Sequence, residues 1–249
     1  MTRRQKNMVT ILAVLALAFG VAPRASAMHI MEGYLQPGYC VAWGIISIPF
    51  LAAGYFSLQK AVKKDRKSIT LIAMAGAFIF VISSLKIPSV TGSCSHMTGT
   101  GLGAILFGPA AVSVLGLIVL VFQAILLAHG GLTTLGANTF SMAIAGPVLS
   151  WLIFKLGEKC KWNRKVTVFF AAFLGDLFTY SITSIQLALA HHTTAGSIGR
   201  ACVEFLTVFA PTQFPLAVLE GILTVIIVMG LETYALPELK AIGMGKEVS

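Results

Sequence analysis

The chain has 249 residues, of which 57% are hydrophobic and only 11% are charged, and its mean hydropathy is +0.87. A soluble domain usually has about 25% charged residues, so this composition excludes an ordinary cytosolic enzyme. Too few polar residues are present to cover a water-facing surface, and the apolar excess must therefore face lipid. The net charge of +9 does not indicate nucleic acid, because the basic residues lie in short clusters beside apolar runs.

The N-terminus has the pattern of a secretory signal. Basic residues at 3–6 precede an apolar run at 8–20, and the small residues Ala-Ser-Ala follow at 25–27. This order predicts a signal peptide at 1–27, whose removal makes Met28 the new N-terminus. An uncleaved signal anchor is the alternative, but the apolar run is short of the roughly 20 residues that span a bilayer.

Apolar stretches follow in chain order and predict an all-α, polytopic membrane protein. They lie at about 38–58, 68–87, 110–128, 139–157, 166–190 and 213–233, with a shorter stretch at 97–108 that glycines interrupt. If the short stretch forms a broken helix, the mature chain has about seven transmembrane helices. Irregular backbone at membrane depth is tolerated only where it is buried in protein or lines a cavity, so the broken helix is the first place to look for a site.

Two basic loops predict the orientation. Lysine and arginine residues cluster at 60–67 and again at 155–165. The positive-inside rule places both loops and the C-terminus in the cytoplasm, and the mature N-terminus outside. The outer connections are then 88–96, 129–138 and 191–212.

The predicted mature N-terminus begins Met28-His29 and offers the donors of a chelate. The free α-amine, the deprotonated His29 backbone nitrogen and His29 Nδ1 can close fused five- and six-membered rings around one divalent ion. Nitrogen donors suit late first-row metals, and the metal drives deprotonation of its ligands. His96, in a loop on the same outer side, is the natural fourth donor; the alternative is a histidine that merely caps the next half-helix.

Several other polar residues have roles that the sequence leaves open. His129 follows the fourth apolar stretch, where an interfacial histidine is as well supported as a ligand or an entrance group, and we place it outside the ligand set. Asp176 and Glu220 lie deep in apolar stretches and should face the interior or pair with a partner, with Lys86 as a candidate counter-charge. We expect helix-bridging amides at Gln123, Asn138, Gln186 and Gln213, and solvated side chains at His191 and His192.

Catalysis and energy coupling are not indicated. Cys94 lies two residues from His96 but lacks an orienting third group, and no HExxH motif supports an intramembrane metalloenzyme. The chain also contains no GxxxxGK[ST] phosphate loop and no repeated halves of the kind found in secondary carriers. The pattern favours a substrate-capturing subunit that docks on other energy-coupling subunits.

Three stretches resemble the CbiM/NikM family: 28–33 (MHIMEG), 89–109 (SVTGSCSHMTGTGLGAILFGP) and 128–138 (AHGGLTTLGAN). The likeness extends over essentially the mature chain. Members are substrate-binding components of energy-coupling-factor transporters for cobalt or nickel. The resemblance implies that Met28, His29 and His96 bind the metal, with the cobalt branch, which supplies cobalamin synthesis, ahead of nickel. It also implies a CbiQ-like coupling subunit, a CbiO-like ATPase and often a small CbiN-like accessory protein. Many relatives begin directly at the Met-His stretch, whereas 27 residues precede it here.

We therefore predict a Co²⁺-capture subunit of an ATP-driven importer in a prokaryotic plasma membrane, with no catalytic residues and no cofactor. Ni²⁺ is the alternative substrate, and a membrane metal sensor or a metalloenzyme is a less supported function. The predicted organisation is a signal peptide at 1–27, a metal-binding segment at 28–37, a transmembrane domain at 38–233 and a cytoplasmic tail at 234–249.

Overall fold

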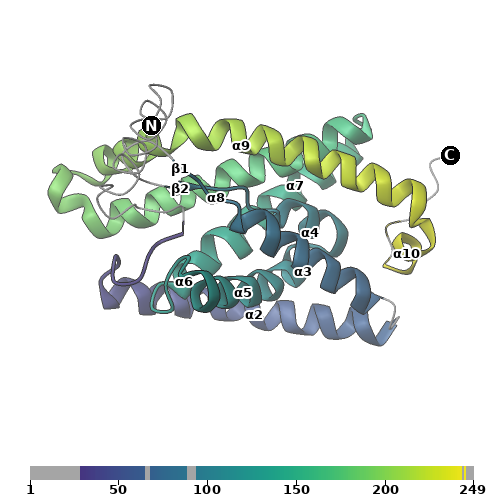
Figure 1. Cartoon of the computed structure of the whole chain (residues 1–249), viewed down its shortest axis with the longest axis horizontal. Coiled ribbons are helices and arrows are strands. Elements are labelled where there is room, and N and C mark those ends of the chain that lie inside the picture. The colour runs from purple at the N-terminus through teal and green to yellow at the C-terminus, as the bar shows by residue number, and fades with distance from the viewer. Residues whose placement is uncertain (1–28, 65–67, 89–93, 243, 245–249) are drawn as a thin grey trace, which may run out of the picture.

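The structure, a computed structural model, describes residues 29–64, 68–88, 94–242 and 244, and this part of the chain is almost entirely helical (Figure 1). The helices are α2 (Pro37–Lys64), α3 (Ser68–Ser84), α4 (Thr100–Phe107), α5 (Pro109–Leu127), α6 (Leu135–Asn138), the π-helix η2 (Thr139–Ala145), α7 (Gly146–Lys159), α8 (Arg164–Ala195), α9 (Ile198–Tyr234) and α10 (Leu236–Ala241). Two-residue strands, β1 (Ile87–Pro88) and β2 (Cys94–Ser95), pair in antiparallel fashion. The predicted signal peptide lies outside the described residues.

The all-helical prediction is confirmed, but the number of about seven spans is not. Within the described residues, five helices are long and apolar enough to cross a membrane: α2, α5, the continuous run from α6 to α7, α8 and α9. Helix α3 is apolar but shorter, with 17 residues. Helix α4 has eight residues and is about 12 Å long, so the predicted broken span at 97–108 is too short for the roughly 30 Å of hydrocarbon in a bilayer.

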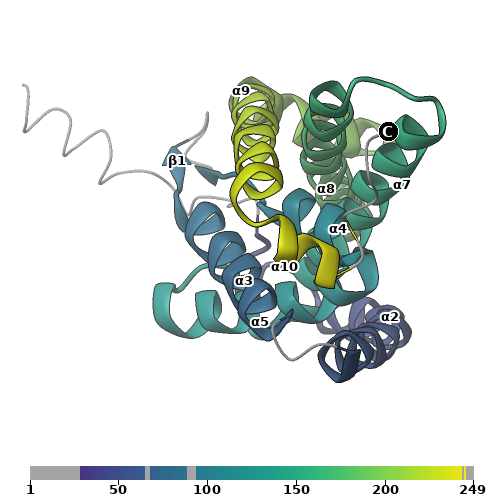
Figure 2. The ribbon, with the colours of Figure 1, turned by 90° about the vertical axis from the view of Figure 1, so that its right-hand side faces the viewer.

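Helix α4 forms the centre of the bundle. It contacts α3, α5, α7 and α8, and the view along the bundle in Figure 2 places it between these helices. All of its residues from Thr100 to Leu106 are buried. Gly101 and Gly103 permit this packing, because a Cβ atom on Gly101 would lie 2.9 Å from the Ala172 backbone and one on Gly103 would lie 2.9 Å from Val112. The glycines that interrupt the apolar stretch therefore allow close helix contact.

Helices α2 and α9 lie along opposite long sides of the bundle (Figure 1). The outer face of α2 is apolar: Val41, Ile45, Ile48 and Phe56 are each between 59% and 65% exposed. Such a surface is expected where a helix faces lipid. The inner face approaches α5 at Gly54, where a Cβ atom would lie 2.3 Å from the Ala110 carbonyl oxygen.

The predicted outer loop at 191–212 is wrong in its conformation, because most of it is helical. Helix α8 continues to Ala195, and after Gly196, with φ of 81°, helix α9 begins at Ile198 and runs for 37 residues. Ser197 caps α9 by accepting a hydrogen bond from the Arg200 backbone N–H. At 1.5 Å per residue α9 is about 55 Å long, so it extends well beyond the hydrocarbon thickness. The predicted tail at 234–249 likewise begins with a helix, α10.

Candidate metal centre

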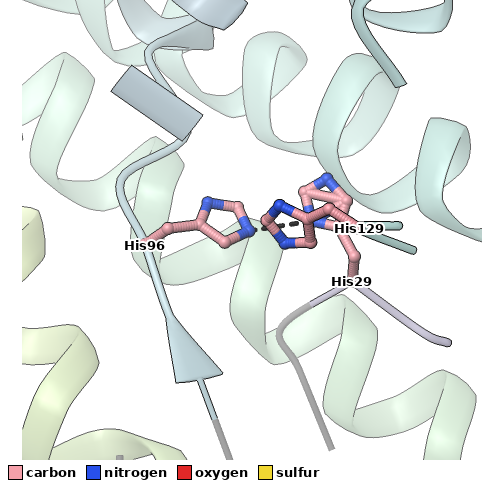
Figure 3. A group of neighbouring side chains, drawn as sticks. All are labelled: His29, His96 and His129. Carbon is pink, nitrogen blue, oxygen red and sulfur yellow. Dashed lines mark hydrogen bonds between the residues drawn. The ribbon is translucent and has the colours of Figure 1, made fainter. Parts of the chain in front are cut away.

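Three histidines from distant parts of the sequence meet inside the protein (Figure 3). His29 lies on the N-terminal segment before α2, His96 follows β2, and His129 follows α5. Their exposed fractions are 3%, 0% and 1%, and one ligand nitrogen from each lies within 4.8 Å of the other two. A buried group of three imidazoles with converging nitrogens is a suitable site for a late first-row divalent ion.

The nitrogens of His29 and His96 have the spacing of neighbouring ligands. His29 Nδ1 lies 2.8 Å from His96 Nε2. Two donors that sit about 2.0–2.1 Å from one ion at a right angle are about 2.8–3.0 Å apart. His96 Nδ1 lies 2.8 Å from the Met97 carbonyl oxygen, which only accepts, so this nitrogen carries the proton and Nε2 keeps its lone pair.

Burial keeps the three rings neutral at physiological pH. It lowers the pKa of His96 to about 4 and that of His129 to about 2, and it lowers the pKa of His29 well below the ordinary value. Repulsion between the imidazolium forms of neighbouring histidines lowers the pKa of His29 and His129 further. Neutral imidazole is the form that binds a metal ion.

The N-terminal segment is held in place by its backbone at Ile30. The Ile30 N–H donates to Asn138 Oδ1 at 2.8 Å, while the Ile30 carbonyl accepts from Asn138 Nδ2 at 3.0 Å and from Thr134 Oγ1 at 2.6 Å. Asn138 immediately precedes the π-helix η2, a type of element often found at functional sites. The predicted helix-bridging role of Asn138 is therefore wrong. Its amide fixes the N-terminal segment that carries His29.

The loop that carries His129 packs directly on the N-terminal segment. Gly130 has φ of 80°, a conformation that favours glycine, and a Cβ atom on Gly131 would lie 2.6 Å from the backbone of Glu32. Glu32 Oε2 accepts a hydrogen bond from the Thr133 N–H at 3.2 Å. The Gly-Gly pair thus permits a close approach that brings His129 against His29, and Glu32 holds the segment.

Helix α9 positions the loop that carries His96. Gln213 Nε2 donates to the His96 carbonyl at 3.1 Å, and Ser95 Oγ lies 2.8 Å from Thr212 Oγ1. Glu220 is fully buried, and its carboxylate accepts from the Thr98 N–H at 2.6 Å, from Thr98 Oγ1 at 2.9 Å and from the Gly99 N–H at 3.0 Å. A carboxylate at this position also complements the positive end of the α4 dipole.

Neutral groups donate hydrogen bonds to both buried carboxylates. Gln213 Nε2 donates to Asp176 Oδ2 at 2.5 Å, which links α8 to α9 beneath the His96 loop. Lys86 is exposed, and none of the ion pairs among the described residues involves it, so its predicted role as a counter-charge is not supported. Gln123 and Gln186 do bridge helices, through Ser83 Oγ and the Ala137 carbonyl.

Other sequence predictions have mixed outcomes. The structure brings His29 and His96 together, while Met28 and the side chain of Cys94 lie outside what it describes. His129, which was placed outside the ligand set from sequence, is the third member of the group. His191 is not simply solvated: its ring packs on Tyr34 at 4.8 Å, and its Nε2 donates to the Tyr34 carbonyl at 3.1 Å.

Comparison with known proteins decides the family. The model of the family described as "CbiM: Cobalt uptake substrate-specific transmembrane region" matches residues 29–237. The chain belongs to the CbiM family. A CbiM-family relative in Lachnoclostridium phytofermentans, the cobalt transport protein CbiM, is 67% identical over 98% of both chains. The cobalt transport proteins CbiM of Ruminiclostridium cellulolyticum and of a Nostoc species are 55% and 54% identical, over 95% and 87% of this chain and 96% and 83% of theirs.

A solved structure shares the fold of this CbiM-family chain. It is the crystal structure of a truncated transition metal transporter, with a TM-score of 0.73 and 28% identity, and the match covers 83% of this chain and 99% of that one. Together with the apolar helices, the family match shows a multi-pass membrane protein. The relatives are named as transport proteins and not as enzymes, in agreement with the prediction from sequence.

Proposed function

We propose that this CbiM-family protein is the substrate-capture membrane subunit of an ATP-driven energy-coupling-factor importer for Co²⁺. The observation that carries the proposal is the group of three buried, neutral histidines whose ligand nitrogens lie within 4.8 Å of one another. Cobalt uptake by the relatives supports the choice of metal. Ni²⁺ is the alternative, since imidazole and amine donors bind both ions.

The proposed ligands are the Met28 amine, the backbone and ring nitrogens of His29, and the ring of His96. The 2.8 Å separation of His29 Nδ1 and His96 Nε2 supports their binding to one ion. The Met28 amine depends on removal of residues 1–27, which the charge, apolar core and small-residue order of the signal supports. In this arrangement the hydrogen bonds at Ile30 set the distance between the new N-terminus and His96.

Energy is proposed to come from partner subunits: a CbiQ-like coupling protein, a CbiO-like ATPase and a small CbiN-like accessory protein. The absence of a phosphate-loop motif from the sequence supports this division of labour. The proposed location is the prokaryotic plasma membrane. Arg164 pairs with Glu158 and with Glu232, so the end of α9 lies beside the basic loop between α7 and α8, which supports a cytoplasmic C-terminus.

Uptake of radioactive cobalt tests the transport role. Cells that express this protein with its coupling subunits should accumulate the isotope, and cells that lack only the ATPase subunit should not. The protein level in the membrane should be equal in the two strains. Equal accumulation with and without the ATPase would contradict capture for ATP-driven import, and binding without any accumulation would favour a sensor.

A one-residue insertion between Ala27 and Met28 tests the amine ligand. If cleavage still follows Ala27, the new amine is displaced by one residue and the fused chelate rings no longer close. We expect Co²⁺ binding to weaken by more than about 100-fold, because loss of supporting groups alone typically costs 10- to 100-fold. N-terminal sequencing must first establish the cleavage site. Unchanged affinity in a correctly cleaved variant would remove the amine from the ligand set.

A further inference from the structure

We propose that His129 is a direct nitrogen donor to the captured ion, in addition to His29 and His96. This inference rests on the proposed function, since it assumes that the histidine group holds a late first-row ion. The added ligand comes from a third segment of the chain, the loop after α5, which the proposed function does not include. A third imidazole donor would also favour Co²⁺ over Ni²⁺.

Both ring nitrogens of His129 are buried without a hydrogen-bond partner among the described residues. The side chain is 1% exposed. Buried polar groups in proteins nearly always have a partner, and an exception calls for an explanation such as an absent ion. His29 differs, because only its Nε2 lacks a partner. An apolar ring would fill the same space without the free-energy cost of burying two unpaired nitrogens, so packing alone does not explain a histidine here.

The His129 ring lies beside both other histidine rings. The His129 ring centroid lies 4.4 Å from that of His29 and 4.9 Å from that of His96, and its plane is nearly perpendicular to the His96 ring, at 88°. Two donors on opposite sides of one ion are about 4.0–4.2 Å apart. The three ligand nitrogens lie within 4.8 Å of one another, so their largest separation exceeds this distance between opposite donors by less than about 1 Å. A small contraction around an ion is enough to give all three bonds.

The His129 backbone is fixed relative to the segment that carries His29. Its N–H donates to the Gln123 carbonyl at 3.1 Å at the end of α5. On the other side, Gly131 is packed against the backbone of Glu32, three residues from His29. The His129 ring is therefore held beside the N-terminal segment from both directions, as a preorganised donor requires.

A further imidazole donor should favour Co²⁺. The proposed amine, the His29 backbone and side-chain nitrogens and His96 together supply four nitrogens, a number that suits planar Ni²⁺ or Cu²⁺. Planar, low-spin Ni²⁺ gains little from a donor outside the plane, whereas Co²⁺ readily takes a fifth ligand. His129 thus gives the site a donor set that raises the relative affinity for Co²⁺.

The test compares the purified, signal-cleaved protein with His129→Phe, which keeps an aromatic ring and removes both nitrogens. Binding of Co²⁺ and of Ni²⁺ is measured by calorimetry, and the visible absorption of the Co²⁺ complex reports the coordination. We expect Co²⁺ affinity to fall by about 10- to 100-fold, Ni²⁺ affinity to fall less, and the Co²⁺ spectrum to change. His192→Phe is the matched control, because His192 lies in the last turn of α8 and is not a member of the histidine group.

The outcomes separate this inference from the proposed function. If the unmodified protein binds neither metal, the proposed function fails. If it binds Co²⁺ and His129→Phe retains the same affinity and spectrum, only the donor role of His129 is overturned. Should His129→Phe unfold, X-ray absorption of the unmodified Co²⁺ complex decides by counting imidazole ligands: three support the proposal and two overturn it. An equal loss for both metals would overturn the preference for Co²⁺.

Discussion

Replacement of His96 by alanine is expected to eliminate tight Co²⁺ binding while leaving the bundle folded. The ring is fully buried, its Nε2 lies 2.8 Å from His29 Nδ1, and its Nδ1 proton is committed to the Met97 carbonyl. The substitution removes the nitrogen donor that we propose this loop contributes. Loss of groups that merely support a ligand costs 10- to 100-fold in affinity, so we expect a loss of more than about 100-fold. Calorimetry with the purified, signal-cleaved protein measures it.

The His96 loop itself should persist in this variant, because most of its attachments are to the backbone. The His96 carbonyl accepts from Gln213, and the next residues are held by Glu220. His192→Ala serves as the matched control, since it removes a histidine that lies outside the metal-binding group. Equal thermal unfolding of both variants would show that the fold is intact. Tight Co²⁺ binding by a folded His96→Ala protein would exclude His96 as a ligand.

Hydropathy predicted where most helices lie, because each residue that faces lipid must be apolar whatever the details of packing. It failed at residues 198–212, which were predicted as part of an outer connection but form the first part of α9, with Pro211 inside the helix. The structure shows a continuous helix there. A proline removes one helical hydrogen bond, but neighbouring helices and side chains can satisfy the freed groups. The local sequence does not show which neighbouring groups satisfy the backbone atoms that proline leaves unpaired.

The site was predictable only where the ligand chemistry is local. A histidine at the second position of a mature N-terminus signals a chelate by itself, and His96 shared the outer side with it. His129 could not be assigned in the same way, because its role depends on Gly130 and Gly131 permitting close contact with the N-terminal segment. That contact joins residues about 100 positions apart, and no periodicity in the sequence reports it.

Helix α9 emerges as the element that holds the His96 loop. Three side chains along it, Thr212, Gln213 and Glu220, contact residues from Ser95 to Gly99. Thr212 and Gln213 lie between the two prolines, where the helix has lost backbone hydrogen bonds. The loop with His96 is therefore tied to one long helix, while His29 is tied to the segment around Asn138 on another part of the bundle. A movement of α9 relative to α6 would separate His96 from His29, the two proposed ligands.

Among the substitutions proposed for this protein, loss of the Glu220 carboxylate is expected to lower the free energy of unfolding most. Glu220→Ala leaves the Thr98 and Gly99 N–H groups and the Thr98 hydroxyl without their buried acceptor. Hydrogen bonds to a charged group contribute about 1.5–3 kcal/mol each, so a loss of several kcal/mol is expected even if the three contributions are not additive. Thermal unfolding in detergent should shift to clearly lower temperature, and Co²⁺ affinity should fall because the loop after His96 is released.

Two further variants distinguish the carboxylate from the size of the side chain. Glu220→Gln keeps the volume but has one oxygen instead of two, and its NH₂ group would face an N–H or O–H donor, so it should also be destabilised. Glu204→Ala is the matched control on the same helix, because Glu204 is 58% exposed and its 3.5 Å contact with Arg200 is a surface ion pair, which contributes little. If Glu220→Gln unfolds at the same temperature and binds Co²⁺ as tightly as the unmodified protein, the charge on Glu220 does not anchor α4. If instead both Glu220 variants unfold at lower temperature and bind Co²⁺ more weakly while Glu204→Ala does neither, the buried carboxylate holds Thr98 and Gly99 at the start of α4 and, through Thr98, sets the position of His96.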